Sequence, residues 1–255
     1  MSGSAGPQVR GARVAAWGLL IYTGARVVAI LLEQTSMAAA VAQAVVAEWG
    51  VGRLGVTWSD PEAEAPTTGM IAKRAAIGAA IGAAIAGAVV LFLKTTGAIL
   101  LSRSSPAASV VIVSLVTAGL YALRDELILH GMTLRAIGAA HPAAMRVLAC
   151  GVASAAAAIG DGASVRAALA RGLFGVVLGA LWVRDRGAWQ AWGAHMAWLF
   201  GTDMLLRGGV FEAQVGASAW GGADAGPLGG SAAIVALLPF VAGAVVWSAR
   251  NAQRA

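Results

Sequence analysis

Two acids and a histidine lie within one short stretch of an otherwise apolar sequence. Residues 124–135 read RDELILHGMTLR and follow an apolar run, so Asp125, Glu126 and His130 lie at the end of a predicted membrane helix or inside it. Glu126 and His130 are four residues apart and share one face of a helix, which predicts that they pair. Asp125 points about 100° away from Glu126. It needs its own partner, because burying an unpaired carboxylate is costly.

A second histidine, His195, lies in another apolar segment, WQAWGAHMAWLF. Ionisable groups inside a bilayer are expensive, and by default they mark functional sites. An acid pair on one span and a histidine on another can activate a water molecule. We therefore predict that Asp125, Glu126 and His195 meet inside a helix bundle.

These residues alone leave three classes of function open. A hydrolase needs a base, a water and oxyanion donors, whereas a transporter needs acids along a path, usually with internal repeats or broken helices. A structural subunit needs the polar groups only as contacts between helices. No metal and no cofactor are expected, because the sequence has no HExxH motif and a single cysteine, Cys150. That cysteine is interpreted as a small buried hydrophobic residue.

The composition indicates a protein whose solvent is the lipid bilayer. Hydrophobic residues make up 59% of the 255 residues and charged residues 12%, against roughly 25% charged in soluble domains. The net charge is +6, but the basic residues occur singly or in pairs between apolar runs. That spacing is typical of membrane proteins and argues against nucleic acid as a partner. The expected location is the bacterial inner (cytoplasmic) membrane.

The apolar runs predict an all-α fold, a polytopic transmembrane helix bundle of about seven or eight helices. The expected spans are 14–33, 75–93, 106–123, 143–160, 167–183, 188–206 and 230–249. The segment 37–48 is too short to assign, and the Gly-rich segment 207–229 cannot form one regular helix. With seven spans, Arg10 and Arg13 lie on the opposite side from Arg250 and Arg254, against the positive-inside rule. Either segment 37–48 also crosses the membrane, or the number of predicted spans is wrong by one.

Small and aromatic residues give two further expectations. Gly78 and Gly82 are four residues apart, which lets two helix backbones approach closely. Tryptophan collects at membrane interfaces, and anchoring there is the interpretation for most of the tryptophans, among them Trp182, Trp189, Trp192 and Trp198.

The motif order resembles a family of membrane proteases. DELILHG resembles the first motif, Glu-Glu-x-x-x-Arg, of the CPBP family (CAAX prenyl endopeptidase and bacteriocin-processing proteins), which are glutamic-type intramembrane proteases. FGVVLGALWVRDRGAWQAWGAHMAWLF is similar to the family's glycine-bearing helix and His-x-x-x-Asn motif, with His195 as the histidine. The resemblance implies a protease core over 106–249, preceded by N-terminal membrane helices and a polar loop over 1–105 and followed by a tail, 250–255.

Several positions depart from the family pattern. Asp125 stands where the family has its first Glu, and His130 where it has Arg. Ala158 and Leu199 stand where the family's second-motif His and third-motif Asn are expected. Asp161 is the nearest candidate to replace the missing histidine.

The resemblance implies an endopeptidase that hydrolyses a peptide bond of a membrane protein or membrane-associated peptide. Asp125 would be the general base, aided by Glu126. His195 would stabilise the oxyanion or orient the water, and His130 would hold Glu126. A myxosortase-like branch of the family processes C-terminal sorting tails. The alternative is a proteolytically inactive relative that binds membrane partners.

Overall fold

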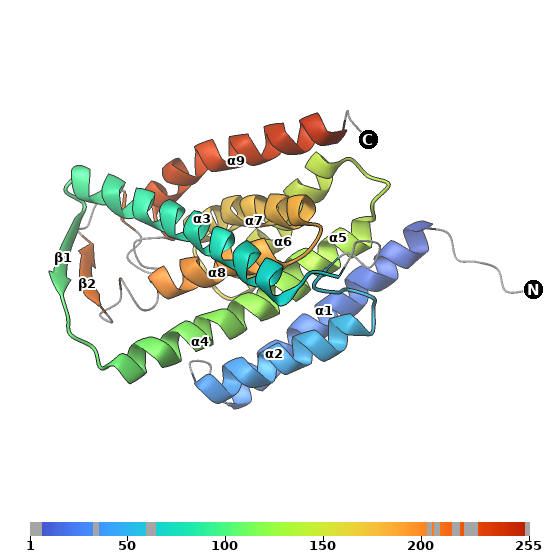
Figure 1. Cartoon of the computed structure of the whole chain (residues 1–255), viewed down its shortest axis with the longest axis horizontal. Coiled ribbons are helices and arrows are strands. Elements are labelled where there is room, and N and C mark those ends of the chain that lie inside the picture. The colour runs from blue at the N-terminus through green and yellow to red at the C-terminus, as the bar shows by residue number, and fades with distance from the viewer. Residues whose placement is uncertain are drawn as a thin grey trace, which may run out of the picture.

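The computed structural model describes residues 7–32, 36–59, 65–202, 206, 210–215, 220–221 and 229–252. These residues form a helix bundle with one two-stranded antiparallel sheet (Figure 1). The prediction of an all-α membrane bundle is confirmed. The elements are α1 (Pro7–Leu31), α2 (Met37–Gly52), α3 (Thr68–Thr95), β1 (Ile99–Arg103), α4 (Ala108–Asp125), η1 (Glu126–Gly131), α5 (Met132–Ile137), α6 (Ala143–Gly160), α7 (Val165–Asp185), α8 (Trp189–Phe200), β2 (Phe211–Val215) and α9 (Ser231–Ala252).

Within the described residues, 6 helices are long and apolar enough to cross a membrane. The span expected over 188–206 is not among them: α8 has 12 residues, half of them buried, and a π-helical turn follows at 201–202. The segment 37–48 belongs to α2, a 16-residue helix that packs on α1. If all 6 cross, the start of α1 and the end of α9 lie on the same side of the membrane, and the conflict with the positive-inside rule does not arise.

The two ends of the bundle differ. The end where α1 begins and α9 ends is called here the terminus end, and the opposite end, which carries β1 and β2, the sheet end (Figure 1). The sheet places β2 in the Gly-rich segment 207–229, so that segment is not one regular helix; most of its other residues lie outside the described part of the chain. Part of the predicted polar loop and Arg254 also lie outside it.

The helix that carries the acid pair is longer than the sequence predicts. Helices α4, η1 and α5 run on without a break as one candidate span, Ala108–Ile137. Its middle part, η1, is a π-helix, a rare geometry that recurs at functional sites. Asp125, Glu126 and His130 therefore lie inside the span rather than at its end.

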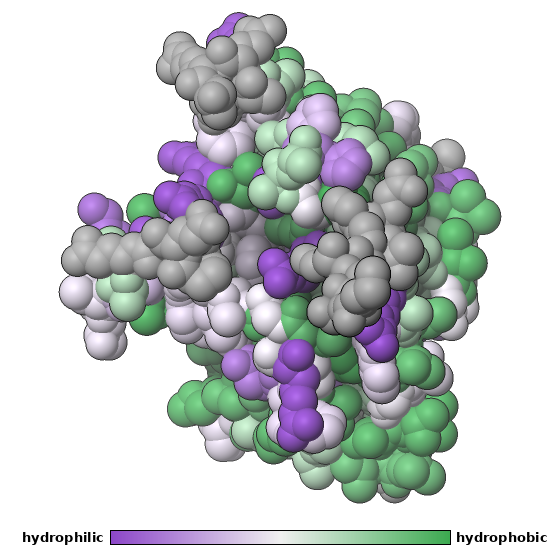
Figure 2. All heavy atoms as spheres, turned by 90° about the vertical axis from the view of Figure 1, so that its right-hand side faces the viewer, coloured by the Kyte–Doolittle hydropathy of each residue, from purple (hydrophilic) through white to green (hydrophobic). Residues whose placement is uncertain are grey.

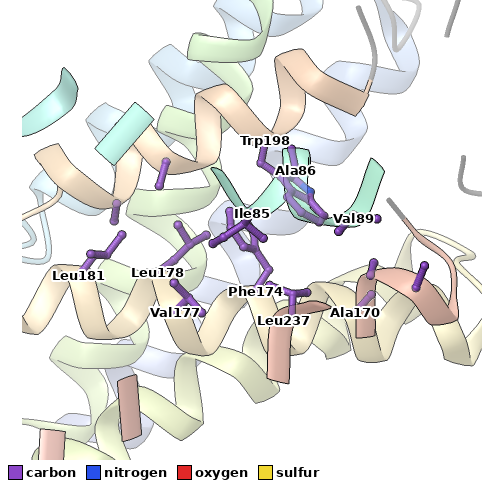
Figure 3. Close-up of a cluster of buried hydrophobic side chains, with 14 of the residues drawn as sticks. Ile85, Ala86, Val89, Ala170, Phe174, Val177, Leu178, Leu181, Trp198 and Leu237 are labelled. Carbon is purple, nitrogen blue, oxygen red and sulfur yellow. The ribbon is translucent and has the colours of Figure 1, made fainter. Parts of the chain in front are cut away.

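Helix α7 forms the centre of the bundle. In the apolar 18-residue stretch of α7, 72% of the residues are buried, against 28% or less in the matching stretches of the other candidate spans. Phe174, Val177 and Leu178 of α7 pack against side chains from α3, α8 and α9 (Figure 3). Large apolar side chains on the outer helices are exposed, among them Leu20 and Ile112, as expected for surfaces that contact lipid.

Glycines bring α3 and α8 into backbone contact, as the spacing of Gly78 and Gly82 predicts. A Cβ on Gly78 would overlap the carbonyl of Gln190, and a Cβ on Gly82 would overlap the carbonyl of Ala194. From the other helix, Gly193 faces the backbone of Ala75 in the same way. This packing fixes the position of α8 along α3, and with it the position of His195.

Candidate active site

Glu126 is the centre of a buried hydrogen-bond network. Its Oε1 lies 2.8 Å from Nδ1 of His195, and its Oε2 lies 3.0 Å from Nδ1 of His130. The indole Nε1–H of Trp182 donates to Oε2 at 2.6 Å. The Glu126 side chain has no solvent exposure. Because a carboxylate only accepts hydrogen bonds, both histidines present an Nδ1–H to it.

His130 extends this network to a fourth helix. Its Nε2 lies 3.0 Å from Oγ of Ser154 on α6. Since Nδ1 carries the proton that faces Glu126, Nε2 accepts the hydrogen bond from the serine hydroxyl. The predicted Glu126–His130 pair is therefore present, and both of the histidine's ring nitrogens are engaged.

Asp125 has a different set of neighbours. Its Oδ1 accepts hydrogen bonds from Nε and Nη2 of Arg124, at 2.7 and 2.6 Å. Arg124 in turn donates through Nη1 to Oε1 of Gln43 on α2, at 2.5 Å. The other carboxylate oxygen, Oδ2, lies 4.0 Å from Nε2 of His195. The predicted meeting of Asp125, Glu126 and His195 inside the bundle thus agrees with this geometry.

The gap between Asp125 and His195 has the size of a water-bridged contact. A separation of 4.0 Å is too long for a direct hydrogen bond. A water about 2.8 Å from each atom would subtend an angle of about 90° between them, close to the angle between its own two O–H bonds. Oδ2 and Nε2 therefore suit one water that donates to both.

These two side chains face a cavity of about 430 Å³. Its outer part is lined by Arg26, Asp161 and Arg171 near the sheet end, and Asp125 and His195 lie deeper. Glu126 is not among the lining residues. The volume is in the range of small-ligand sites, so a short segment of extended peptide fits. The geometry gives Asp125 and His195 the access to a substrate that Glu126 lacks.

Asp161 lies on the same cavity but is held by α1. Its Oδ1 accepts a hydrogen bond from the hydroxyl of Tyr22 at 2.9 Å and lies 3.1 Å from Nε of Arg26. Both of these neighbours belong to α1, at the mouth of the cavity. This position favours a role in shaping the opening over a role beside Asp125.

The two positions at which the resemblance predicts a histidine and an asparagine also line the cavity. Ala158 and Leu199 both belong to its wall, as do Asp125 and His195. The polar groups that this chain offers instead are Gln43, Arg124 and Arg171. Within the described part of the chain, no group of three or more His, Cys, Asp or Glu side chains has the arrangement of a metal site.

Sequence reasoning missed several residues of this site. Trp182 was interpreted as an interface anchor, yet its indole is buried and donates to Glu126. Arg124 adjoins Asp125 in the sequence, and that adjacency was the available signal for the ion pair. Ser154 and Gln43 join the network from α6 and α2, and no local pattern in the sequence indicates either contact.

One comparison with known proteins finds a matching family. Residues 105–201 match the model of a family described as type II CAAX prenyl endopeptidase Rce1-like. No curated protein and no solved structure matches the chain. The matched segment contains Asp125, Glu126, His130, Asp161 and His195. The match covers 97 of the 255 residues and supports the predicted resemblance to the CPBP family of CAAX-type membrane proteases.

Proposed function

We propose that the protein is an intramembrane endopeptidase in which Asp125 is the general base. The observation that carries this proposal is the 4.0 Å separation of Asp125 Oδ2 and His195 Nε2 on the wall of one cavity. A water that donates to both atoms directs its lone pairs away from them, toward a peptide carbonyl in the cavity. On attack, Asp125 takes the proton from the water and then passes it to the leaving amine.

Three buried residues, Glu126, His130 and Trp182, support this step without touching the substrate. Glu126 holds the Nδ1–H of His195, which leaves Nε2 as the acceptor that orients the water. His130 and Trp182 hold Glu126 in turn. Arg124 and Arg171 line the cavity, and their positive charge would stabilise the oxyanion that develops on the carbonyl.

A second cavity supports a substrate that is itself in the membrane. An apolar groove of about 510 Å³ lies between α1, α5 and α6 and shares Tyr22, Leu129 and Ala157 with the active-site cavity. Its other lining residues are mostly Ala, Gly, Leu, Ile and Met. An apolar segment of a substrate in this groove would present the adjoining peptide bond to Asp125.

The distribution of basic residues supports cleavage on the non-cytoplasmic side. The terminus end carries most of the described basic residues, namely Arg10, Arg13, Arg53, Lys73, Arg74, Arg135, Arg146, Arg184, Arg186 and Arg250; the sheet end carries Arg26, Lys94, Arg103, Arg166 and Arg171. The positive-inside rule assigns the terminus end to the cytoplasm. The cavity mouth, near Asp161 and Arg171, then faces the opposite side.

This orientation favours the processing of C-terminal sorting tails, in which a membrane helix anchors the substrate and the cut falls outside the cytoplasm. The proposed place of action is the inner membrane of a bacterium. Both assignments rest on the orientation and the groove together.

The test compares newly formed termini of membrane proteins in cells that carry wild type, Asp125→Asn or Glu212→Gln as their only copy. Glu212 is exposed on β2 and is the matched control for loss of a carboxylate. We expect specific cleaved termini in wild type and in Glu212→Gln and their uncleaved precursors in Asp125→Asn, with equal amounts of inserted protein.

Two results would contradict the proposal. Unchanged termini in Asp125→Asn would favour the inactive relative, in which packing changes alone disturb the phenotype. Loss of cleavage when a chelator is added to wild-type membranes would assign the reaction to a metal.

A further inference from the structure

Helix α2 turns a single polar side chain toward the active site. Gln43 is the one polar residue of this helix between Met37 and Ala47. The residues buried beside it are small, namely Ala39, Ala40, Ala44 and Ala47. The other face of α2 carries large exposed side chains, namely Met37, Val41, Val45 and Trp49. Hydrophobic side chains gather along the lower edge of Figure 2, the level at which Figure 1 places α2. Gln43 therefore faces the bundle, whereas the opposite face of its helix suits lipid.

Both ends of the Gln43 amide have partners. Its Oε1 accepts a hydrogen bond from Nη1 of Arg124 on α4, and its Nε2 donates to the carbonyl of Ala39 at 3.1 Å. Gln43 belongs to the wall of the active-site cavity, but only 1% of the residue is exposed. A substrate in the cavity would find almost no surface of Gln43 to contact. Any effect of Gln43 on the reaction therefore passes through Arg124.

The guanidinium group of Arg124 joins Gln43 to Asp125. Its Nε and Nη2 both donate to Oδ1 of Asp125, at 2.7 and 2.6 Å. Its Cζ lies 5.2 Å from the centre of the Tyr121 ring. Asp125 and Tyr121 belong to the same helix as Arg124, whereas Gln43 holds the guanidinium from another helix. Because an arginine side chain is long and has many rotamers, a contact from a second helix restricts where its planar group can lie.

The direction of the Asp125 carboxylate depends on this guanidinium. The last torsion of an aspartate side chain is soft, so its two oxygens take fixed directions only when one of them is held. Arg124 holds Oδ1, and Oδ2 then faces Nε2 of His195 at 4.0 Å. If Arg124 lost its contact with Gln43, the guanidinium and the carboxylate could turn together. The separation that suits a water would then no longer be fixed.

We infer that Gln43 is a positioning residue, which holds Asp125 through Arg124 in the direction that the general base requires. The inference rests on the proposed function, because it takes Asp125 as that base. Gln43 lies outside residues 105–201, so the family match assigns it no role. It makes α2 part of the machinery of the site. The contrasting role is a contact that only stabilises the packing of two helices, and the test separates the two.

The test measures hydrolysis by the purified full-length chain in a neutral detergent. Its substrate is a synthetic peptide that spans a cleavage site identified from the newly formed termini of membrane proteins. Gln43→Met keeps the length of the side chain but removes the acceptor for Arg124. Gln43→Ala removes the same acceptor and is the second variant if Gln43→Met folds poorly.

Ser248→Ala is the control for a loss of stability alone. Ser248 is fully buried on α9, and its hydroxyl donates to the carbonyl of Ala244. The described residues of α9 do not line the active-site cavity. This variant therefore removes a buried polar contact without touching Arg124 or Asp125. Melting temperatures are measured for all variants.

We expect Gln43→Met to lower kcat about tenfold or more, because a small displacement of a reacting group is costly. KM should stay within about twofold of wild type, since the contact acts on the base and not on substrate binding. Ser248→Ala should keep the kcat of wild type even where its melting temperature falls.

A double variant shows whether Gln43 acts through Arg124. Arg124→Lys keeps the charge but offers a compact ammonium in place of the planar fork, so it cannot hold Asp125 and Gln43 together. Residues that act through one another are not additive, so adding Gln43→Met to Arg124→Lys should change kcat by less than about twofold.

The outcomes separate this inference from the proposed function. A wild-type kcat in Gln43→Met or Gln43→Ala, while Asp125→Asn is inactive, would overturn the inference and leave the proposed function standing. An equal fall of kcat in Ser248→Ala, or an undiminished effect of Gln43→Met beside Arg124→Lys, would also overturn it, because Gln43 would then only stabilise the fold. No hydrolysis by wild type, or hydrolysis that persists in Asp125→Asn, would overturn the proposed function and the inference with it.

Discussion

The two ring nitrogens of His195 face two different carboxylates. Nδ1 lies 2.8 Å from Oε1 of Glu126, whereas Nε2 lies 4.0 Å from Oδ2 of Asp125. The first contact is a direct hydrogen bond and the second leaves room for a water. His195 therefore connects two acids. Glu126 is fully buried and positions the histidine, whereas Asp125 lies on the cavity wall, where it can act on a substrate.

Glu126→Gln should destabilise the folded protein. The amide places an N–H group where one carboxylate oxygen accepts a hydrogen bond, so it meets a donor from His195 or from His130 and Trp182. A buried polar group without a partner costs about 1–3 kcal/mol. Thermal unfolding in detergent should show a lower midpoint for this variant. Glu212→Gln is the control, and equal midpoints for the two variants would contradict the network.

Gly82→Ala should disturb the contact between α3 and α8. The new Cβ would overlap the carbonyl of Ala194, the residue before His195, and overpacking of this kind typically costs about 1–3 kcal/mol. Gly87→Ala, on the same helix, meets nothing within 4 Å, so this control should be neutral or stabilising. The two variants are compared by folded yield in size-exclusion chromatography and by thermal midpoint. A Gly82→Ala protein as stable as Gly87→Ala would contradict the packing.

Single introduced cysteines should report the orientation in the membrane. Val165 is 81% exposed at the sheet end, and Ala140 is exposed in the turn between α5 and α6 at the terminus end. The native Cys150 is fully buried and should give little background. In intact cells with a permeable outer layer, an impermeant maleimide should label Val165→Cys, and Ala140→Cys only after the inner membrane is opened. The reverse pattern would place the cavity mouth in the cytoplasm.

Local patterns in the sequence predicted the parts of the site that lie on one helix. The four-residue spacing of Glu126 and His130 indicated their pairing, and the cost of buried charge indicated that His195 would join them. Contacts between helices were harder to predict, because hydropathy gives the length of a span but not the direction of its side chains. Trp182 shows this: near the end of a span it has the pattern of an interface anchor, and only packing directs its indole to Glu126.

Helix α8 and the strand pair show the same limit of prediction from local sequence patterns. Segment 188–206 has the hydropathy of a span, but α8 covers only Trp189–Phe200 and half of its residues are buried by other parts of the bundle. The strand pair β1 and β2 joins segments about 110 residues apart, and a pairing over such a distance leaves no periodic signal in the sequence.

The most direct test of Asp125 as the general base is a rate of peptide-bond hydrolysis. It is measured for purified Asp125→Asn and Asp125→Glu on a substrate that the newly formed termini of membrane proteins identify. Asn matches Asp in shape but cannot take the proton from the water, so we expect a kcat at least about 10²-fold below that of wild type. Glu restores a carboxylate facing His195 and should retain a measurable rate, well above that of Asn. Hydrolysis by Asp125→Asn at the wild-type rate would contradict the assignment of Asp125 as the general base.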